Sequence, residues 1–366
     1  MSAPIEGRSP VRKFLLSAVC AGLFVGLVLA DGSGANHQVR TTSYGSSGGN
    51  ANDITHAFCC GGTLGSLVTK GGTQYILSNN HVLARVDQAG LGEDITQPGL
   101  IDNGCSVATV VADFSQAVPL GTQNVDAALA AVRSGLMNNT GKILDIGVPC
   151  ATPGTPRVGL PVAKSGRTTG CQQGTIGSIN TNVSVQYQKN CGSGKKFTIP
   201  YTNQVVINST TFSAGGDSGS LIVSGSCSAT GSETNGDNAP VALLFAGSSS
   251  STIGNPIQDV IAALGVGFVG TSMCSAPTSA STATAFGREP LQNDLDFATM
   301  IKDRHAPDMM RSPEIIGVGV GVMDDDPSRV TLVVYVDSTR PVQSRVPTKV
   351  DGVPVKIVRT DPFVAY

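Results

Sequence analysis

Short apolar runs separated by turn residues recur along most of the chain. The runs that predict β-strands cover residues 73–77, 107–111, 205–207, 221–223 and 241–245. Glycine, serine and asparagine stand between them, as tight turns between strands require. One helical pattern follows at residues 255–264, with Asn255 as the expected N-cap and Pro256 as the expected first helical residue. We therefore predict a mainly β domain closed by one helix.

The pattern changes after residue 268. Residues 271–290 are rich in Ser, Ala and Thr, which is typical of a linker. A helical pattern at residues 291–311 is interrupted by Pro307. Strand-like runs follow it at residues 315–323, 330–336 and 350–358. These segments predict a small α/β accessory module over residues 291–366.

The first 30 residues follow a third pattern. Arg12 and Lys13 precede an apolar run that ends in Val28, Leu29 and Ala30, which predicts a secretory signal peptide cleaved after Ala30. An uncleaved N-terminal membrane anchor stays open as an alternative, because this run is just long enough to span a bilayer. Residues 31–57 are expected to form a Gly/Ser-rich leader, and residues 58–270 the main domain.

Composition agrees with an exported β protein. Hydrophobic residues make up 40% of the 366, charged residues 14%, and glycine contributes 45 positions. Of nine cysteines, removal of Cys20 with the signal leaves an even number, which fits disulfides in an oxidising compartment. Cys171 and Cys191 flank a predicted hairpin and are expected to pair. The formal net charge of −2 gives no reason to expect a nucleic-acid partner.

The candidate nucleophile is Ser218. It lies in a Gly-Gly-Asp-Ser-Gly-Ser run at residues 215–220, where glycines let the backbone approach a substrate closely. The backbone N–H groups of Gly216 and Ser218 would then be free to bind a developing oxyanion. A Gly/Ser-rich chain also produces such runs in ordinary loops, so Ser218 needs partners.

A serine nucleophile requires a base and a carboxylate that orients the base. Among four histidines, His81 ends an apolar run, and a strand end is a rigid mount for a base. His37 and His56 lie in or beside a polar, Gly-rich run where neither is expected to be held rigidly, and His305 lies far downstream. Asp126 precedes an unbroken apolar run, where burial would require a partner. Each residue alone has a structural explanation, but the order His, Asp, Ser points to a triad.

These contexts resemble the chymotrypsin-like serine peptidases. Residues 163–170 and 174–176 are similar to the alpha-lytic protease and streptogrisin branch. Residues 77–84, 97–99, 118–120 and 125–130 are similar to the narrow-leaf-type trypsin-like peptidases. The resemblance covers roughly residues 58–268.

The resemblance implies a double six-stranded antiparallel β-barrel with the active site between the barrels. It implies that His81 is the general base, that Asp126 orients its imidazole and that Ser218 attacks. The N–H groups of Gly216 and Ser218 would form the oxyanion hole. No metal and no organic cofactor is implied. Asp217 is expected to form local hydrogen bonds, because no sequence for a newly cut N-terminus precedes the domain.

The resemblance also places the first substrate pocket. Its expected lining consists of two segments, Phe212 and Ser213, then Phe245, Ala246, Gly247 and Ser248. Neither segment holds an acidic residue that could pair with a Lys or Arg side chain of the substrate. We therefore expect cleavage after small or apolar residues. The same run shows no clear counterpart of the serine that commonly supports the catalytic aspartate.

Together these patterns predict an exported serine endopeptidase that acts on protein or peptide substrates through an acyl-enzyme, in the extracellular space or cell envelope. Two alternatives stay open: a catalytically silent protease-fold binding or scaffolding protein, and an esterase with the same triad. The module at residues 291–366 holds no second triad. It is expected either to dock on the protease domain, with residues 362–366 covering the cleft, or to serve targeting or partner binding.

Overall fold

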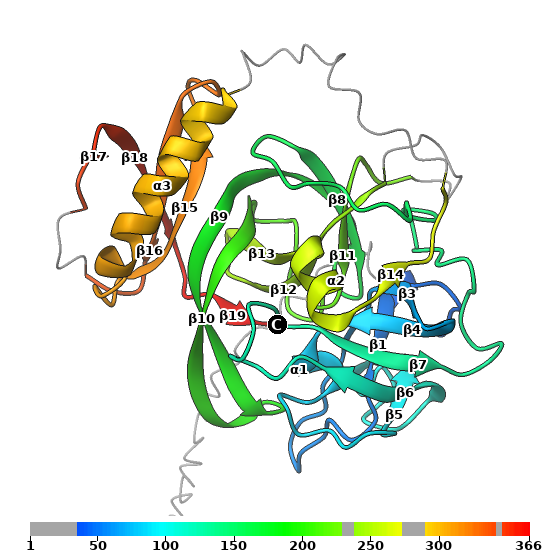
Figure 1. The fold of residues 1–366 in the computed structure, drawn as a ribbon. Helices are drawn as coiled ribbons and strands as arrows, with labels where there is room; N and C mark the ends of the chain where they lie inside the picture. The colour runs from blue at the N-terminus through cyan, green and yellow to red at the C-terminus, as the bar shows by residue number, and fades with distance from the viewer. Residues whose placement is uncertain (1–34, 229–237, 273–289, 342–345) are drawn as a thin grey trace, which may run out of the picture.

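The computed structural model describes residues 35–228, 238–272, 290–341 and 346–366 (Figure 1). The expected signal segment at residues 1–30 and nearly all of the expected linker lie outside these ranges. Within them, the mainly β prediction is confirmed. No helix among the described residues is long and apolar enough to cross a membrane.

The first sheet has eight strands and carries the N-terminal half of the domain. Its order is β14 (Gly267–Phe268), β3 (Ser66–Lys70), β4 (Thr73–Ser78), β7 (Ala128–Val132), β6 (Thr109–Ala117), β5 (Asp94–Gln97), β1 (Ser46–Asn50) and β2 (Gly62–Leu64). Strand β1 lies in the segment expected to be a leader, and it pairs with both β2 and β5. The sheet therefore begins before residue 58.

The second sheet contains a closed ring of six strands. The ring runs β10 (Ser193–Asn208), β13 (Ser251–Pro256), β12 (Pro240–Gly247), β11 (Leu221–Ser224), β8 (Pro161–Gly166) and β9 (Gly170–Asn190), and β9 pairs back to β10. Burial alternates along β9, whereas β12 and β13 are buried at every position because other parts of the molecule cover their outer side. This ring corresponds to the second of the two six-stranded barrels expected from the sequence.

Three short helices complete the main domain. Helix α1 (Asn80–Leu83) follows β4, and the 3-10 helices η1 (Ala35–His37) and η2 (Leu100–Asp102) lie in the first half. The longer helix α2 (Ile257–Leu264) follows the last ring strand and buries Ile257, Val260 and Leu264 against the core of the first sheet. The helix starts one residue later than predicted, because Asn255 belongs to β13 and Pro256 is the N-cap.

The C-terminal module extends the second sheet. Strand β15 (Ile315–Val322) pairs antiparallel with β9, and β16 (Val330–Asp337), β18 (Val353–Thr360) and β17 (Lys349–Val350) continue from it. Helix α3 (Gln292–Met309) contains Pro307 in its last turn and continues past it. Figure 1 shows this layer, orange to red, beside the green β9 and β10, with β19 (Val364–Ala365) reaching back into the main domain.

The disulfides differ from the expected pairing. Cys171 bonds to Cys227, and Cys191 bonds to Cys60, so the predicted pair of Cys171 with Cys191 is wrong. A third bridge joins Cys59 to Cys105. The reason is the length of β9: its 21 residues carry Cys171 near one end, and Cys191 follows the other end. A hairpin strand this long keeps its two ends apart.

Candidate active site

His81 lies at the end of a rigid strand. Strand β4 buries Ile76, Leu77 and Ser78 completely, and His81 follows in α1. The side chain of Asn79 donates a hydrogen bond to the backbone oxygen of Asp126 at 2.7 Å. This bond ties the turn that carries His81 to the segment that carries Asp126.

Asp126 and His81 form a short hydrogen-bonded pair. Asp126 Oδ2 lies 2.6 Å from His81 Nδ1, and the His81 backbone N–H donates to Asp126 Oδ1 at 3.3 Å. Asp126 is fully buried, and its own backbone N–H donates to the Asn255 side chain at 3.0 Å. A buried carboxylate is tolerated when its oxygens are hydrogen-bonded in this way. Asn255 is thus a support for Asp126 and not the helix cap expected from the sequence.

Tyr187 supplies a further donor to the carboxylate. Its hydroxyl, on β9, donates to Asp126 Oδ2 at 2.8 Å and lies 2.8 Å from the Tyr201 hydroxyl. Burial, and then the charge of Asp126, raises the pKa of Tyr187 well above its usual value, so the phenol stays protonated. No pattern along the sequence indicates this role of Tyr187. Its hydroxyl comes from β9 and not from residues 245–248, where the resemblance shows no clear supporting serine.

Ser218 lies on a turn that packs tightly against the first sheet. Gly216 and Gly219 have φ values of 96° and 93°, which side-chain-bearing residues rarely adopt. A Cβ on Gly219 would overlap the Ser78 hydroxyl, and the Thr63 backbone N–H donates to the Ser218 backbone oxygen at 2.8 Å. Glycine is therefore required for the approach of this turn to β2 and β4.

The Ser218 turn and the His81 helix meet across Gly62. A Cβ on Gly62 would lie 2.6 Å from a Val82 methyl carbon and 3.1 Å from the Ser218 backbone oxygen. Ser218 is buried, and its Oγ donates to the backbone oxygen of Phe245 at 3.2 Å. His81 Nε2 lies 3.0 Å from the backbone oxygen of Tyr366. The structure thus places the Ser218 turn next to the helix that carries His81. Among the described residues, the Ser218 hydroxyl bonds to Phe245 and His81 Nε2 lies against Tyr366, so the two side chains do not bond to each other.

The backbone of the Ser218 turn leaves two donors for a ligand. Asp217 and Ser220 donate their N–H groups to Ala214 and Asp217, and Gly219 donates to Leu244. Within the described part of the chain, the N–H groups of Gly216 and Ser218 have no protein acceptor. Two adjacent free donors beside a serine are what an oxyanion site requires.

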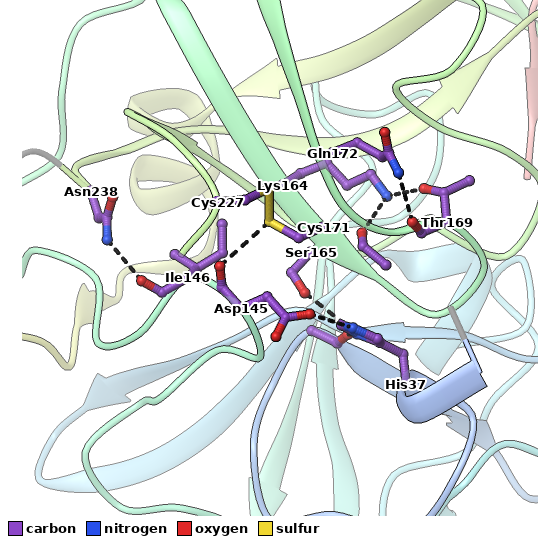
Figure 2. The surroundings of a disulfide bond; sticks show 12 residues. His37, Asp145, Ile146, Lys164, Ser165, Thr169, Cys171, Gln172, Cys227 and Asn238 are labelled. Carbon is purple, nitrogen blue, oxygen red and sulfur yellow. Dashed lines mark hydrogen bonds and ion pairs between the residues drawn. A yellow bond between two sulfur atoms is a disulfide. The ribbon is translucent and has the colours of Figure 1, made fainter. Parts of the chain in front are cut away.

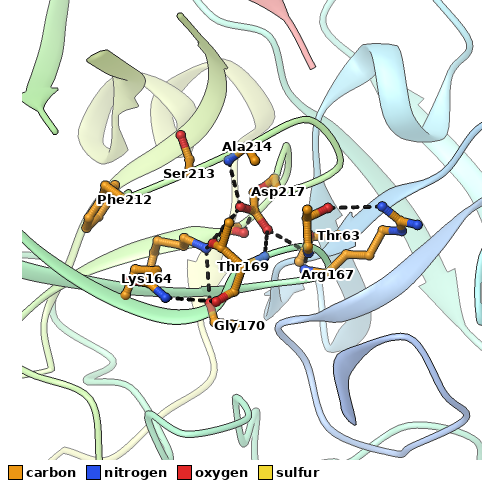
Figure 3. Close-up of polar contacts among 12 residues, drawn as sticks. Thr63, Lys164, Arg167, Thr169, Gly170, Phe212, Ser213, Ala214 and Asp217 are labelled. Atoms are coloured by element: carbon orange, nitrogen blue, oxygen red, sulfur yellow. Dashed lines mark hydrogen bonds and ion pairs between the residues drawn. The ribbon is translucent and has the colours of Figure 1, made fainter. Parts of the chain in front are cut away.

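Asp217 forms a buried ion pair rather than only local hydrogen bonds (Figure 3). Its carboxylate lies 3.1 Å from Lys164 Nζ on β8 and accepts hydrogen bonds from the N–H groups of Thr168 and Ala214. Lys164 also donates to the backbone oxygen of Gly170 at 3.0 Å. Burial lowers the pKa of Lys164, and the charge of Asp217 opposes that shift. This pair fixes the turn from the side opposite Ser218.

The expected pocket residues divide into two groups. Phe212 and Phe245 are fully buried in core clusters, and the Phe245 ring meets that of Tyr201 edge-on with centroids 5.0 Å apart. Their side chains therefore belong to the hydrophobic core rather than to an open surface. Ser248 accepts a hydrogen bond from the Tyr366 hydroxyl at 3.1 Å, and a Cβ on Gly247 would overlap that hydroxyl. Gly247 and Ser248 thus border the space into which a side chain points.

A cavity of ≈ 220 Å³ lies beside His81 and Tyr366, and its lining includes Asp53, Gly61 and Arg85. Burial raises the pKa of Asp53 to about 6, although Arg85 and His81 favour its charged form. The cavity continues the cleft from His81 toward the Cys60–Cys191 disulfide. No cluster of three or more His, Cys, Asp or Glu side chains suited to a metal occurs among the described residues.

His37 is held rigidly, contrary to the expectation from its Gly-rich surroundings (Figure 2). It is buried, with Nδ1 2.7 Å from the Gly45 backbone oxygen and Nε2 3.0 Å from Asp145 Oδ2. Ser165 Oγ lies 3.4 Å from Nδ1. His305, by contrast, lies on α3 and contacts Asp351 at 2.8 Å, within the C-terminal module.

Comparisons with known proteins found similar solved structures but no sequence match. No family model matches the chain, and no curated protein matches it. A solved glutamic-acid-specific serine protease, described as using a histidine triad in substrate binding, is similar at 21% identity and a TM-score of 0.43, over 62% of this chain and 98% of that one. The chymotrypsin of Cellulomonas bogoriensis is similar at 16% identity and a TM-score of 0.41, over 63% of this chain and 99% of that one.

An alpha-lytic protease homologue, N4, is similar at 20% identity and a TM-score of 0.37, over 63% of this chain and 98% of that one. The case for this chain's own fold and chemistry rests on the strands and residues described above.

Proposed function

We propose that the chain is a serine endopeptidase in which Ser218 is the nucleophile, His81 the general base and Asp126 the residue that orients His81. The observation that carries the proposal is the buried Asp126–His81 pair at 2.6 Å, whose other imidazole nitrogen faces the cleft beside the Ser218 turn. A carboxylate on Nδ1 holds the tautomer in which Nε2 can accept a proton.

The reaction follows from these positions. With a substrate carbonyl in the cleft, Ser218 Oγ attacks the carbon while His81 Nε2 takes the hydroxyl proton, and Asp126 stabilises the imidazolium. The N–H groups of Gly216 and Ser218 bind the oxyanion. His81 then protonates the leaving amine, and water hydrolyses the acyl-enzyme by the same steps.

Substrate class and location complete the proposal. We infer a first pocket formed with Ser213, Ala246, Gly247 and Ser248 that takes an apolar side chain, since these residues bring no negative charge to it. Asp217, whose charge acts on Tyr366, is already paired with Lys164. Three disulfides among the described residues suit an oxidising compartment, which supports export of the chain to the extracellular space or cell envelope.

The test is covalent labelling of the full chain with a fluorophosphonate, followed by peptide mapping. We expect one label, at Ser218, that the variants Ser218→Ala and His81→Ala both abolish. The matched control is Ser165→Ala, which removes the hydroxyl beside His37 and should leave labelling intact. A label elsewhere, a label that survives His81→Ala, or no label in either the full chain or its Tyr366→Ala variant would contradict the proposal. Casein cleavage by the labelling-competent protein then separates a peptidase from an esterase.

A further inference from the structure

Residues 363–366 lie in the cleft as an extended peptide. In β19, Ala365 lies opposite Ala246 and Val364 opposite Gly247, antiparallel to β12. On the other side, the Gln186 backbone N–H of β9 donates to the Phe363 backbone oxygen at 2.9 Å. Backbone pairing to a strand edge is a recurrent way to bind an extended peptide in a sequence-tolerant manner.

The register of this segment brings its last residue to the candidate catalytic groups. Tyr366 places its backbone oxygen 3.0 Å from His81 Nε2. Ala246, opposite Ala365, directly follows Phe245, whose carbonyl accepts the Ser218 hydroxyl. Tyr366 therefore stands where the residue before a cleaved bond would stand, and Ala365 and Val364 occupy the two positions before it.

The Tyr366 side chain fills the first pocket. Its hydroxyl donates to the Ser248 backbone oxygen at 3.1 Å. The phenol packs against the hydrophobic cluster of the second sheet that contains Phe212. Burial raises the pKa of Tyr366 to about 12, although Ser213 favours the phenolate. Because Gly247 has no side chain, the phenol fits across it. The pocket thus accepts an aromatic ring and offers an acceptor to its hydroxyl.

The segment is anchored one residue earlier. Phe363 is 1% exposed and meets the Tyr335 ring edge-on, with centroids 5.7 Å apart. It belongs to the same core cluster as Tyr187, Tyr201 and Phe245. The three residues after it are only partly buried. Residues 364–366 can therefore leave the groove while Phe363 keeps them tethered close by.

We propose that residues 364–366 are a tethered, substrate-like inhibitor, and that the groove they fill takes peptides with tyrosine before the cleaved bond. The proposal rests on the proposed function, in that Ser218 is the nucleophile that the segment covers. A short tether gives an effective concentration in the millimolar range, so that even a weakly binding segment keeps the groove filled. Displacing the segment frees His81 Nε2 for Ser218.

The first test compares fluorophosphonate labelling rates of full-length variants. Tyr366→Ala removes the pocket-filling ring, and we expect labelling of Ser218 to become about 10-fold faster, as loss of a tethered competitor predicts. The matched control is Met300→Ala on the exposed face of α3, which leaves the rate unchanged. Equal rates for Tyr366→Ala and the unaltered chain would overturn the inhibitory role while leaving Ser218 as the nucleophile.

A second test needs no catalysis. A fluorescein-labelled peptide of sequence Asp-Pro-Phe-Val-Ala-Tyr is titrated into the Ser218→Ala chain, with and without Tyr366→Ala, and anisotropy is read. We expect the peptide to bind at least about 10-fold more tightly when Tyr366 is replaced, because the groove is then open. Equal or absent binding would overturn the proposal even if labelling succeeds. Binding without labelling would instead leave the groove assignment standing and contradict the proposed peptidase activity.

The pocket is tested with peptide amide substrates that differ only in the residue before the cleaved bond. In the Tyr366→Ala chain we expect kcat/KM to fall in the order Tyr, Phe, Ala, with Lys not cleaved. Loss of the hydroxyl leaves the Ser248 oxygen without its donor, which separates Tyr from Phe. Gly247→Ala should lower kcat/KM far more for the substrate with Tyr before the cleaved bond than for the substrate with Ala there. A preference for Ala or Lys over Tyr would overturn the pocket assignment.

Discussion

Two groups of serine, histidine and aspartate lie in this molecule, and they differ in which imidazole nitrogen meets the carboxylate. At the cleft, Asp126 binds Nδ1 of His81, and Nε2 lies 3.0 Å from the backbone oxygen of Tyr366. In the second group, Asp145 binds Nε2 of His37, while Nδ1 meets the Gly45 backbone oxygen. The carboxylate thus leaves Nε2 of His81 but Nδ1 of His37 for a second partner.

Their surroundings differ as well. The Asp145 side chain is 47% exposed, whereas that of Asp126 is fully buried and receives the Tyr187 hydroxyl. The acceptor on the second nitrogen also differs, since Gly45 is part of the fixed backbone beside Leu64 and Tyr366 belongs to a tethered segment. What makes a histidine a base is therefore a nitrogen whose partner can be exchanged for a substrate.

The largest expected effect tests the two carboxylates against each other. Asp126→Asn should lower kcat by about 10⁴-fold, because an amide at Nδ1 favours the wrong imidazole tautomer, as the same substitution does in a known serine peptidase. Asp145→Asn should change kcat by less than about twofold, since Asp145 holds a histidine away from the cleft. Steady-state kinetics in the Tyr366→Ala background measure both. Similar losses in the two variants would remove the distinction between the groups.

The next effect concerns Lys164, which lies between the two groups. It precedes Ser165 in β8 and pairs with Asp217, the residue before Ser218. Lys164→Met leaves the buried Asp217 charge without its partner, which should lower the free energy of unfolding by about 3–5 kcal/mol. Urea denaturation followed by circular dichroism measures it. The control is Lys189→Met, which lies outside this pair. An equal loss of unfolding free energy in that variant would show that the Lys164–Asp217 pair does not stabilise the protein more than another lysine does.

Tyr187 sharpens the comparison on a smaller scale. Tyr187→Phe removes one donor to Asp126 but leaves the direct Asp126–His81 bond, so kcat should fall about 10-fold with KM nearly unchanged. The control is Tyr44→Phe, beside the His37 group. Among the described residues, the buried Tyr44 hydroxyl has no hydrogen-bond partner, so its removal should leave both activity and stability unchanged. A loss of kcat in Tyr44→Phe would contradict the assigned roles.

The sequence was most informative where chemistry has a local signature. Ser218 stands among glycines that its turn requires, and His81 lies three residues after a buried strand, in the short helix α1. The prediction that His37 is not held rigidly is wrong, because its partner Asp145 lies 108 residues away and a Gly-rich neighbourhood does not reveal it. Tyr187 and the cysteine pairing depend on the register and length of β9. The register and length of β9 are set by its pairing with β8, β10 and β15, which lie far from it or on both sides of it in the sequence.

The smallest effect uses pH to exchange the partner of His81 Nε2. The pKa of Tyr366 is raised by burial to about 12, with a further contribution from the Asp217 charge, while a free tyrosine titrates near 10. Because burial favours the neutral phenol, residues 364–366 bind the groove with full affinity below pH 10. This affinity weakens as the pH rises toward 12. At pH 10.5 the segment should bind about fourfold more weakly, and Ser218 labelling should accelerate in proportion.

Tyr366→Phe has no phenol to titrate, so the ratio of the labelling rate of the unaltered chain to that of Tyr366→Phe isolates this step from every other alkaline effect. A ratio that stays constant from pH 9 to 10.5 would show that the phenol does not control access to His81, and the difference between the two histidines would then rest on their carboxylates alone.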